Sequence, residues 1–191
     1  LSGTLLTAQA AVGGFLLSFI VGFCIAVLFS QSRWIERSLY PYAIFLQTVP
    51  IVAIAPLIVL WIGYGLSGVI AVSFIISLFP IIANTTAGLT SVEQDLLDLF
   101  DLHESSRWQV LTKLRIPYAV PNMLTGVRIS CGLSVIGAIV GEFFAGFGTQ
   151  QQGLGTIIMI TNSQTKTPYL FACVLCSTAL GLLFFGSISS L

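Results

Sequence analysis

Apolar residues form long runs along this chain, and short polar segments separate the runs. An α-helix needs about 20 apolar residues to cross about 30 Å of hydrocarbon. By this measure the pattern predicts five membrane-spanning helices. Their expected ranges are Leu5–Phe29, Pro41–Tyr64, Gly68–Leu89, Asn122–Gly141 and Pro168–Ser190. The runs are continuously apolar instead of alternating, which does not fit the strands of a membrane barrel.

The composition agrees with a membrane protein. Of the 191 residues, 56% are hydrophobic and only 7% are charged, whereas a soluble domain carries about 25% charged residues. Seven basic residues balance seven acidic ones, so no basic surface for nucleic acid is predicted. We therefore expect an all-α polytopic membrane protein in which residues 1–191 form a single transmembrane domain.

The charged residues indicate how the chain is oriented. Two spans separate residues 30–39 from residues 90–118, so both segments must lie on one side of the membrane. They contain Arg33, Arg37, Arg107, Lys113 and Arg115. The opposite side has only Lys166, so the positive-inside rule places the two segments in the cytoplasm and the N-terminus outside. Because the chain begins with Leu1 instead of Met, we expect an N-terminal segment, a further span, to precede it.

Small residues and prolines mark two features inside the spans. The first span has small residues at every fourth position: Ala10, Gly14, Ser18, Gly22 and Ala26. They predict close helix packing within one subunit, with a dimer contact as the alternative. Pro50, Pro56 and Pro80 predict kinks, which either line a transport cavity or bend the helices for packing.

Few residues suggest chemistry. His103 is the only histidine, so no triad, metal site, cofactor or enzyme is predicted. All four cysteines are interpreted as small buried apolar residues: Cys24, Cys131, Cys173 and Cys176. Glu142 ends the fourth span, and two interpretations stand equally: a functional carboxylate, or a helix-end group in water or paired with Lys166. The segment Thr149–Gly155 is expected to be an external turn or a re-entrant segment.

The polar segment before the fourth span has the signals of two short helices. Ser91 with Gln94, and Ser106 with Gln109, have the spacing of capping boxes, in which a hydroxyl and an amide satisfy the first N–H groups of a helix. The pattern therefore predicts a helical hairpin with a break near Glu104–Ser105.

We expect Pro117 and Pro121 to end this hairpin before the fourth span. Segment 91–117 carries five acidic and three basic residues, and this net negative charge disfavours an anionic bilayer. Docking on a partner protein is the better interpretation, with Leu99 and Phe100 buried in a groove of the partner.

These residues resemble a known motif. Asp98-Leu99-Phe100, Glu104 and Leu114-x-Ile116-Pro117 match the spacing of the "EAA" loop of binding-protein-dependent ABC importer permeases. The chain looks similar to the nitrate, taurine and aliphatic-sulfonate branch over most of its length. The supporting stretches are Ser32–Arg37, Phe79–Thr85, Ser106–Gln109, Leu124–Ile129, Glu142–Phe143 and Gln152–Gly155.

The resemblance implies a MetI-like permease fold with six spans, and a loop 91–117 that is the coupling helix seated in a cleft of an ATPase. The residues it implicates in coupling are Asp98, Leu99, Phe100, His103, Glu104, Ser106, Arg107, Trp108 and Pro117. Two positions depart from the motif. Asp98 replaces a glutamate, and Glu104 replaces a glycine, so the turn must form without the conformational freedom of glycine.

The function that follows is a permease subunit of an ATP-driven importer in the bacterial cytoplasmic membrane. It would move a small solute, of anion, sulfonate or vitamin-precursor type, by alternating access. Expected partners are two cytoplasmic ATP-binding subunits, a second permease copy or paralogue, an extracytoplasmic substrate-binding protein and membrane lipid. Candidate pathway residues are Gln47, Pro50, Asn84 and Glu142. The alternatives are an ion-coupled secondary carrier and a membrane scaffold.

Overall fold

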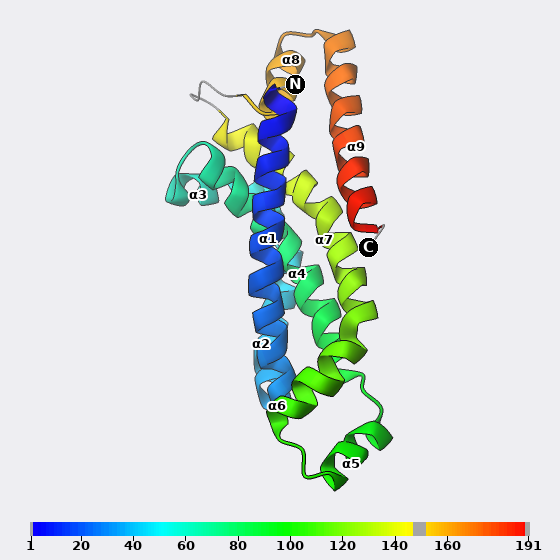
Figure 1. The fold of residues 1–191 in the computed structure, drawn as a ribbon. Helices are drawn as coiled ribbons and strands as arrows, with labels where there is room; N and C mark the ends of the chain where they lie inside the picture. The colour runs from blue at the N-terminus through cyan, green and yellow to red at the C-terminus, as the bar shows by residue number, and fades with distance from the viewer. Residues whose placement is uncertain (1, 147–151, 190–191) are drawn as a thin grey trace.

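A computed structural model describes residues 2–146 and 152–189, without the side chains at positions 33, 36, 43, 46 and 47. The regular structure in this part of the chain is helical, which confirms the all-α class (Figure 1). In chain order the helices are α1 (Ser2–Gln31), α2 (Arg33–Thr48), α3 (Ile51–Ile62), α4 (Leu66–Thr90), α5 (Gln94–Leu102), α6 (Arg107–Val110), the π-helical turn η1 (Leu111–Arg115), α7 (Ile116–Ala145), α8 (Leu154–Ser163) and α9 (Thr167–Ser189).

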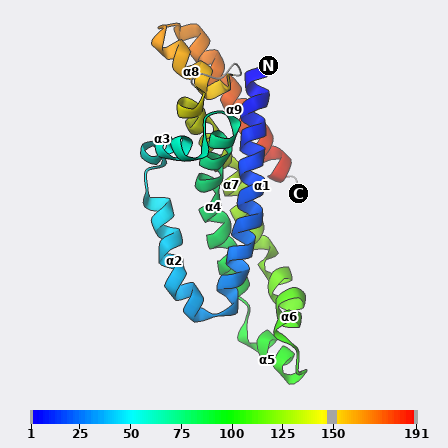
Figure 2. The ribbon, with the colours of Figure 1, turned by 90° about the vertical axis from the view of Figure 1, so that its left-hand side faces the viewer.

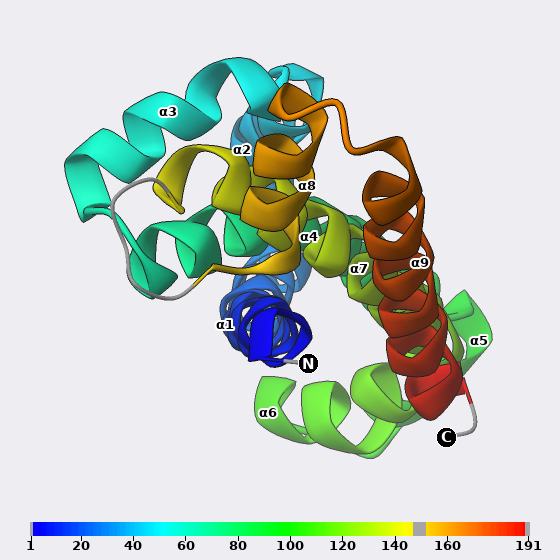
Figure 3. The same cartoon turned by 90° about the horizontal axis from the view of Figure 1, so that it is seen from above.

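Four helical segments are long and apolar enough to cross a membrane: α1, α4, the continuous segment Arg107–Ala145, and α9. They correspond to four of the five predicted spans. In the view from above, α3 and α9 lie on opposite sides of α4 and α7 (Figure 3). Only Cys173 of α9 is buried, so most of the apolar surface of α9 faces away from this subunit.

The prediction that the second span, Pro41–Tyr64, is a single helix is wrong. The chain leaves α2 at Thr48 and enters α3 at Ile51, and α3 lies across the direction of the long helices (Figure 2). The cause is Pro50, whose ring disfavours a helical conformation at the preceding residue. Val49 is accordingly extended, with φ −70° and ψ 124°. Pro50 thus breaks the helix, a larger effect than the expected kink.

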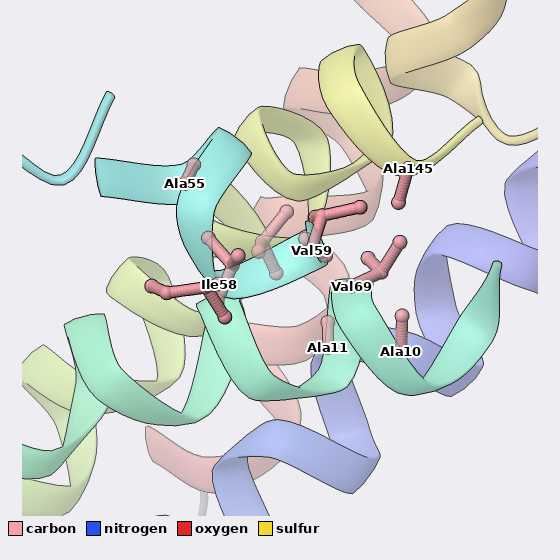
Figure 4. Packing of buried hydrophobic residues seen from close by; sticks show 10 residues of the cluster. Ala10, Ala11, Ala55, Ile58, Val59, Val69 and Ala145 are labelled. Carbon is pink, nitrogen blue, oxygen red and sulfur yellow. The ribbon is translucent and has the colours of Figure 1, made fainter. Parts of the chain in front are cut away.

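A cluster of apolar side chains holds α3 in this crossing position. Ile58 and Val59 of α3 are buried with Val69 of α4 and with Ala10 of α1. The close-up shows Val59 and Val69 facing Ala145, the last residue of α7 (Figure 4). The short helix is therefore part of the core near the N-terminal end of α1.

Small residues let α1, α4 and α7 approach closely. All five residues of the predicted stripe on α1 are buried, and α4 covers them. A Cβ on Gly14 would lie 2.5 Å from the Ser73 Cβ, and one on Gly22 would lie 2.9 Å from Ile81 Cγ2. The expectation of packing within one subunit is confirmed. Gly137 of α7 makes the same kind of contact with the Ser73 backbone.

Serine hydroxyls cross-link these three helices. Ser18 and Ser77 share a hydrogen bond with an O–O distance of 2.6 Å. Ser73 donates to the Ser134 carbonyl at 2.8 Å, and Ser130 donates to the Ser77 carbonyl at 2.7 Å. A membrane interior offers little hydrophobic drive between helices, so close packing and such hydrogen bonds supply the association.

The fourth span continues into the polar hairpin without a break. Pro117 and Pro121 do not end the hairpin, and that prediction is wrong. Pro117 lies inside this helix, directly after a π turn in which the Ile116 N–H is bonded to the Leu111 carbonyl. The π turn changes the regular hydrogen-bond pattern next to the position where proline has no N–H. One helical segment therefore runs from Arg107 to Ala145.

Candidate functional site

The two predicted loops lie at the same end of the molecule. The α5–α6 hairpin and the α1–α2 junction are both at the end opposite the N-terminus and α8 (Figures 1 and 2). A hydrogen bond joins them: Arg115 Nη1 donates to the Ser30 carbonyl at 2.6 Å. This arrangement agrees with the expectation that segments 30–39 and 90–118 share one side of the membrane.

Glu104 makes the turn of the hairpin. Its φ is +51°, in the left-handed region that favours glycine. The Ser105 N–H donates to the Phe100 carbonyl at 3.1 Å, and the Glu104 N–H donates to the Asp101 carbonyl at 2.9 Å. These two bonds are the pattern of a Schellman motif, in which a residue with positive φ follows the helix. The motif's glycine position thus keeps the conformation of glycine although the residue is glutamate.

One of the two predicted capping boxes is present. Ser106 Oγ accepts from the Gln109 N–H at 3.3 Å, and Gln109 Oε1 accepts from the Ser106 N–H at 2.9 Å. The other prediction is wrong, because Ser91 Oγ donates to the Gly88 carbonyl at the end of α4. Glu93 precedes α5 instead, without a side-chain cap.

The hairpin presents apolar side chains outside the bundle. Leu102 is 81% exposed, Trp108 70% and Leu99 48%. Leu99, Phe100 and His103 also line a hollow of about 370 Å³ between α5 and the helix that follows. Sequence reasoning missed Leu102, although its position three residues after Leu99 places it near the same face.

The other predicted coupling residues are found as follows. Asp98 is exposed and accepts a hydrogen bond from Gln94 Nε2 at 2.8 Å. His103 Nδ1 lies 2.8 Å from the Leu99 carbonyl. Arg107 and Pro117 are exposed, the latter on the first turn of α7. All nine belong to the hairpin or to its junction with α7.

Glu142 lies near the opposite end, buried to 4% exposure. Thr7 Oγ1 of α1 donates to its carboxylate at 2.8 Å, and the Gly155 N–H of α8 donates at 2.7 Å. Thr156 Oγ1 donates to the Glu142 carbonyl at 3.0 Å. The alternative of a helix-end carboxylate in water is therefore wrong. Lys166 is exposed, and the described residues form no ion pair with the carboxylate.

Two of the other three pathway candidates, Asn84 and Pro50, lie away from Glu142. Asn84 is half-buried between α4 and α7, where its Nδ2 donates to the Pro80 carbonyl at 2.8 Å. Pro50 is exposed at the α2–α3 junction. The side chain of Gln47 lies outside the described residues. So do the first three residues of the predicted turn or re-entrant segment Thr149–Gly155, whose last two residues begin α8.

The cysteines are all free, and their expected burial holds for two of them. Cys131 and Cys173 are buried, whereas Cys24 and Cys176 are exposed. An all-apolar helix does not reveal from sequence which side faces the lipid, so this distinction needed the packing. Residues 2–146 and 152–189 contain no group of three or more His, Cys, Asp or Glu side chains that could hold a metal ion.

The bundle and its exposed hairpin define a polytopic membrane protein with a helical element projecting from one end. The chain belongs to the family of inner membrane components of binding-protein-dependent transport systems, whose pattern matches residues 14–190. It is therefore a multi-pass inner-membrane protein, as expected from the sequence.

Several curated proteins are similar. The chain is 36% identical over 171 residues to the riboflavin transport system permease protein RibX of Chloroflexus aurantiacus, covering 90% of the chain and 62% of RibX. It is 35% identical over 178 residues to the formylaminopyrimidine transport permease protein ThiX of Halalkalibacterium halodurans, covering 93% of the chain and 70% of ThiX. The putative aliphatic sulfonates transport permease protein SsuC of Bacillus subtilis is 31% identical over 168 residues, covering 88% of the chain and 59% of SsuC. The chain thus spans between about three fifths and seven tenths of these relatives.

Proposed function

We propose that this chain is the membrane-spanning permease subunit of an ATP-driven importer, and that its α5–α6 hairpin is gripped by a cytoplasmic ATPase. The observation that carries the proposal is the hairpin itself. It projects from the bundle with Leu102 at 81% and Trp108 at 70% exposure, and exposed apolar side chains on a polar element favour docking in a partner's groove.

Two ATP-binding subunits, a second permease copy or paralogue, and an extracytoplasmic binding protein complete the proposed assembly. The names of the similar permeases support a small solute as cargo, whether an anion, a sulfonate or a vitamin precursor. The chain catalyses no chemistry. In alternating access, the ATPase moves the hairpin and the pathway opens to the other side. Gln47, Pro50, Asn84 and Glu142 remain the predicted pathway residues.

The proposal is tested by co-purification with the ATP-binding subunit of the same transport system. Phe100→Asp puts a charge into the hollow that Phe100 lines and is expected to abolish ATPase association while leaving membrane insertion intact. Asp98→Lys should do the same by reversing an exposed charge. Val12→Asn, on the outer surface of α1, is the control for general damage. Full ATPase association by Phe100→Asp would contradict the docking role.

The scaffold and carrier alternatives make different predictions. A scaffold would bind the ATPase without affecting its turnover. An ion-coupled carrier would transport without ATP and stop when the proton gradient is removed. The family relationship favours the importer over the carrier. ATP hydrolysis by the purified complex that responds to the binding protein would separate the importer from the scaffold.

A further inference from the structure

The first turn of α8 is built around the Glu142 carboxylate. A Cβ on Gly155 would lie 2.9 Å from Glu142 Cβ, and one on Gly153 would overlap the carboxylate itself. Only glycine fits at these two positions, because any side chain would displace the carboxylate from the α8 backbone. The Gly153-Leu154-Gly155 stretch is therefore a cradle for Glu142.

Thr7 closes this arrangement from α1. Its hydroxyl donates to the carboxylate and accepts from the Leu154 N–H at 2.9 Å. The first N–H groups of a helix have no partner within the helix. Here Thr7 and Glu142 provide the acceptors for Leu154 and Gly155. A single carboxylate thus holds α1, α7 and α8 together.

The opposite end of α7 leads directly to the hairpin. Residues 107–145 are continuously helical, with the π turn η1 close to the hairpin, so one helical segment joins the hairpin to the α8 end. Ala145 also accepts from the Gly65 N–H at 3.1 Å, which ties the start of α4 to the same end. Movement of α6 therefore reaches the α8 end through one helix.

From these contacts we infer that Glu142 is a positioning residue for transport: it makes α8 part of the same rigid unit as α7, so that α8 moves with the α5–α6 hairpin. Residues 162–166, the exposed polar stretch that ends α8 and follows it, are then displaced on the outer surface whenever the hairpin moves. This inference rests on the proposed coupling function and adds the link between the two ends of the subunit.

Glu142→Gln should disturb the hydrogen bonds to Thr7 and Gly155 less than Glu142→Ala does. Glu142→Gln can keep its oxygen toward the Gly155 N–H while its amide donates to Thr7 Oγ1. Thr7 in turn can donate to the Gly3 carbonyl, which lies 3.1 Å away. Glu142→Ala leaves the buried Gly155 N–H without an acceptor, which is costly in a buried site. Thr7→Val keeps the shape of the side chain and removes only its hydroxyl.

Distance measurements between two spin labels test the inference. Tyr118→Cys, at the start of α7, and Asn162→Cys, in the last turn of α8, are exposed attachment sites. The exposed native thiols of Cys24 and Cys176 are first replaced by alanine. Labelled permease is diluted with unlabelled permease in the reconstituted complex with its ATPase. The distance is then measured without nucleotide and after trapping with ATP and vanadate.

With Glu142 the distance distribution should be narrow and the same in both states. Glu142→Ala should broaden it or shift it on trapping, Glu142→Gln should restore the narrow distribution, and Ser134→Ala, a buried hydroxyl within α7, should change nothing. A narrow, unshifted distribution in Glu142→Ala would overturn the inference. If that variant does not assemble, Thr7→Val is measured instead: broadening supports the inference and an unchanged distribution overturns it. Failure of the labelled protein with Glu142 to associate with the ATPase would overturn the proposed function instead.

Discussion

The guanidinium of Arg115 donates a hydrogen bond to the carbonyl of Ser30 at 2.6 Å, although the two residues are 85 positions apart. Ser30 lies in the last turn of α1, where carbonyl groups have no partner within the helix. A cation at this end also interacts favourably with the helix dipole. The contact therefore fixes the base of the hairpin to the end of a membrane-spanning helix.

Replacement of this arginine should loosen that junction. We expect Arg115→Met to lower the free energy of unfolding by about 1.5 kcal/mol, the usual size of a hydrogen bond to a charged group. Thermal unfolding of the detergent-solubilised permease measures the change. Lys113→Met is the control, because Lys113 is exposed on the same π turn. Equal effects of the two substitutions would show that the Ser30 contact has no special role.

Position 104, which has a left-handed backbone conformation, should accommodate glycine better than glutamate. Glu104→Gly removes the Cβ that makes a φ of +51° unfavourable, a gain of about 1 kcal/mol, part of which the entropy of glycine offsets. The Ser105 N–H, bonded to the Phe100 carbonyl, should then exchange with solvent more slowly. Glu93→Gly, at an ordinary φ of −60°, should give no such protection. Faster exchange of Ser105 in Glu104→Gly would contradict the strain argument.

Alanine substitutions of the two serines predicted to form capping boxes, Ser91 and Ser106, should have different effects on helix stability. Ser106→Ala removes the acceptor of the Gln109 N–H and should cost about 1 kcal/mol of local helix stability. Ser91→Ala removes only a bond to the end of α4 and should leave α5 unchanged. Hydrogen exchange of α6 and α5, respectively, measures both effects. Similar losses of protection in the two helices would be the contrary result.

Close packing of α1 on α4 should make Gly14 intolerant of a side chain. Gly14→Val would place new atoms against Ser73 and within 2.9 Å of the Phe74 nitrogen, and overpacking of this kind costs about 1–3 kcal/mol. The midpoint of thermal unfolding in detergent should fall accordingly. Gly132→Ala has open space around its Cβ and serves as the control, with no loss expected. Normal stability of Gly14→Val would mean that α1 and α4 can separate without cost.

How much of this could be read from sequence depended on the range of the interactions. The apolar runs that predict α1, α4, α7 and α9 are local properties, because length and composition alone decide whether a helix can cross hydrocarbon. The Ser106–Gln109 box and the break at Glu104 are equally local, since each involves residues only a few positions apart. The resemblance of Asp98-Leu99-Phe100 to a family motif identified the hairpin before its shape was known.

Only the tertiary structure decided which distant groups meet. Pro50 indicates that the helix is interrupted, but the direction of α3 depends on the packing of Val59 with Val69 in the core. Glu142 has no partner within its own segment that sequence could suggest. Its donors come from Thr7, 135 residues away, and from the start of α8. A buried carboxylate is stable only where such donors converge, and convergence is a property of the packed helices, which no local pattern records.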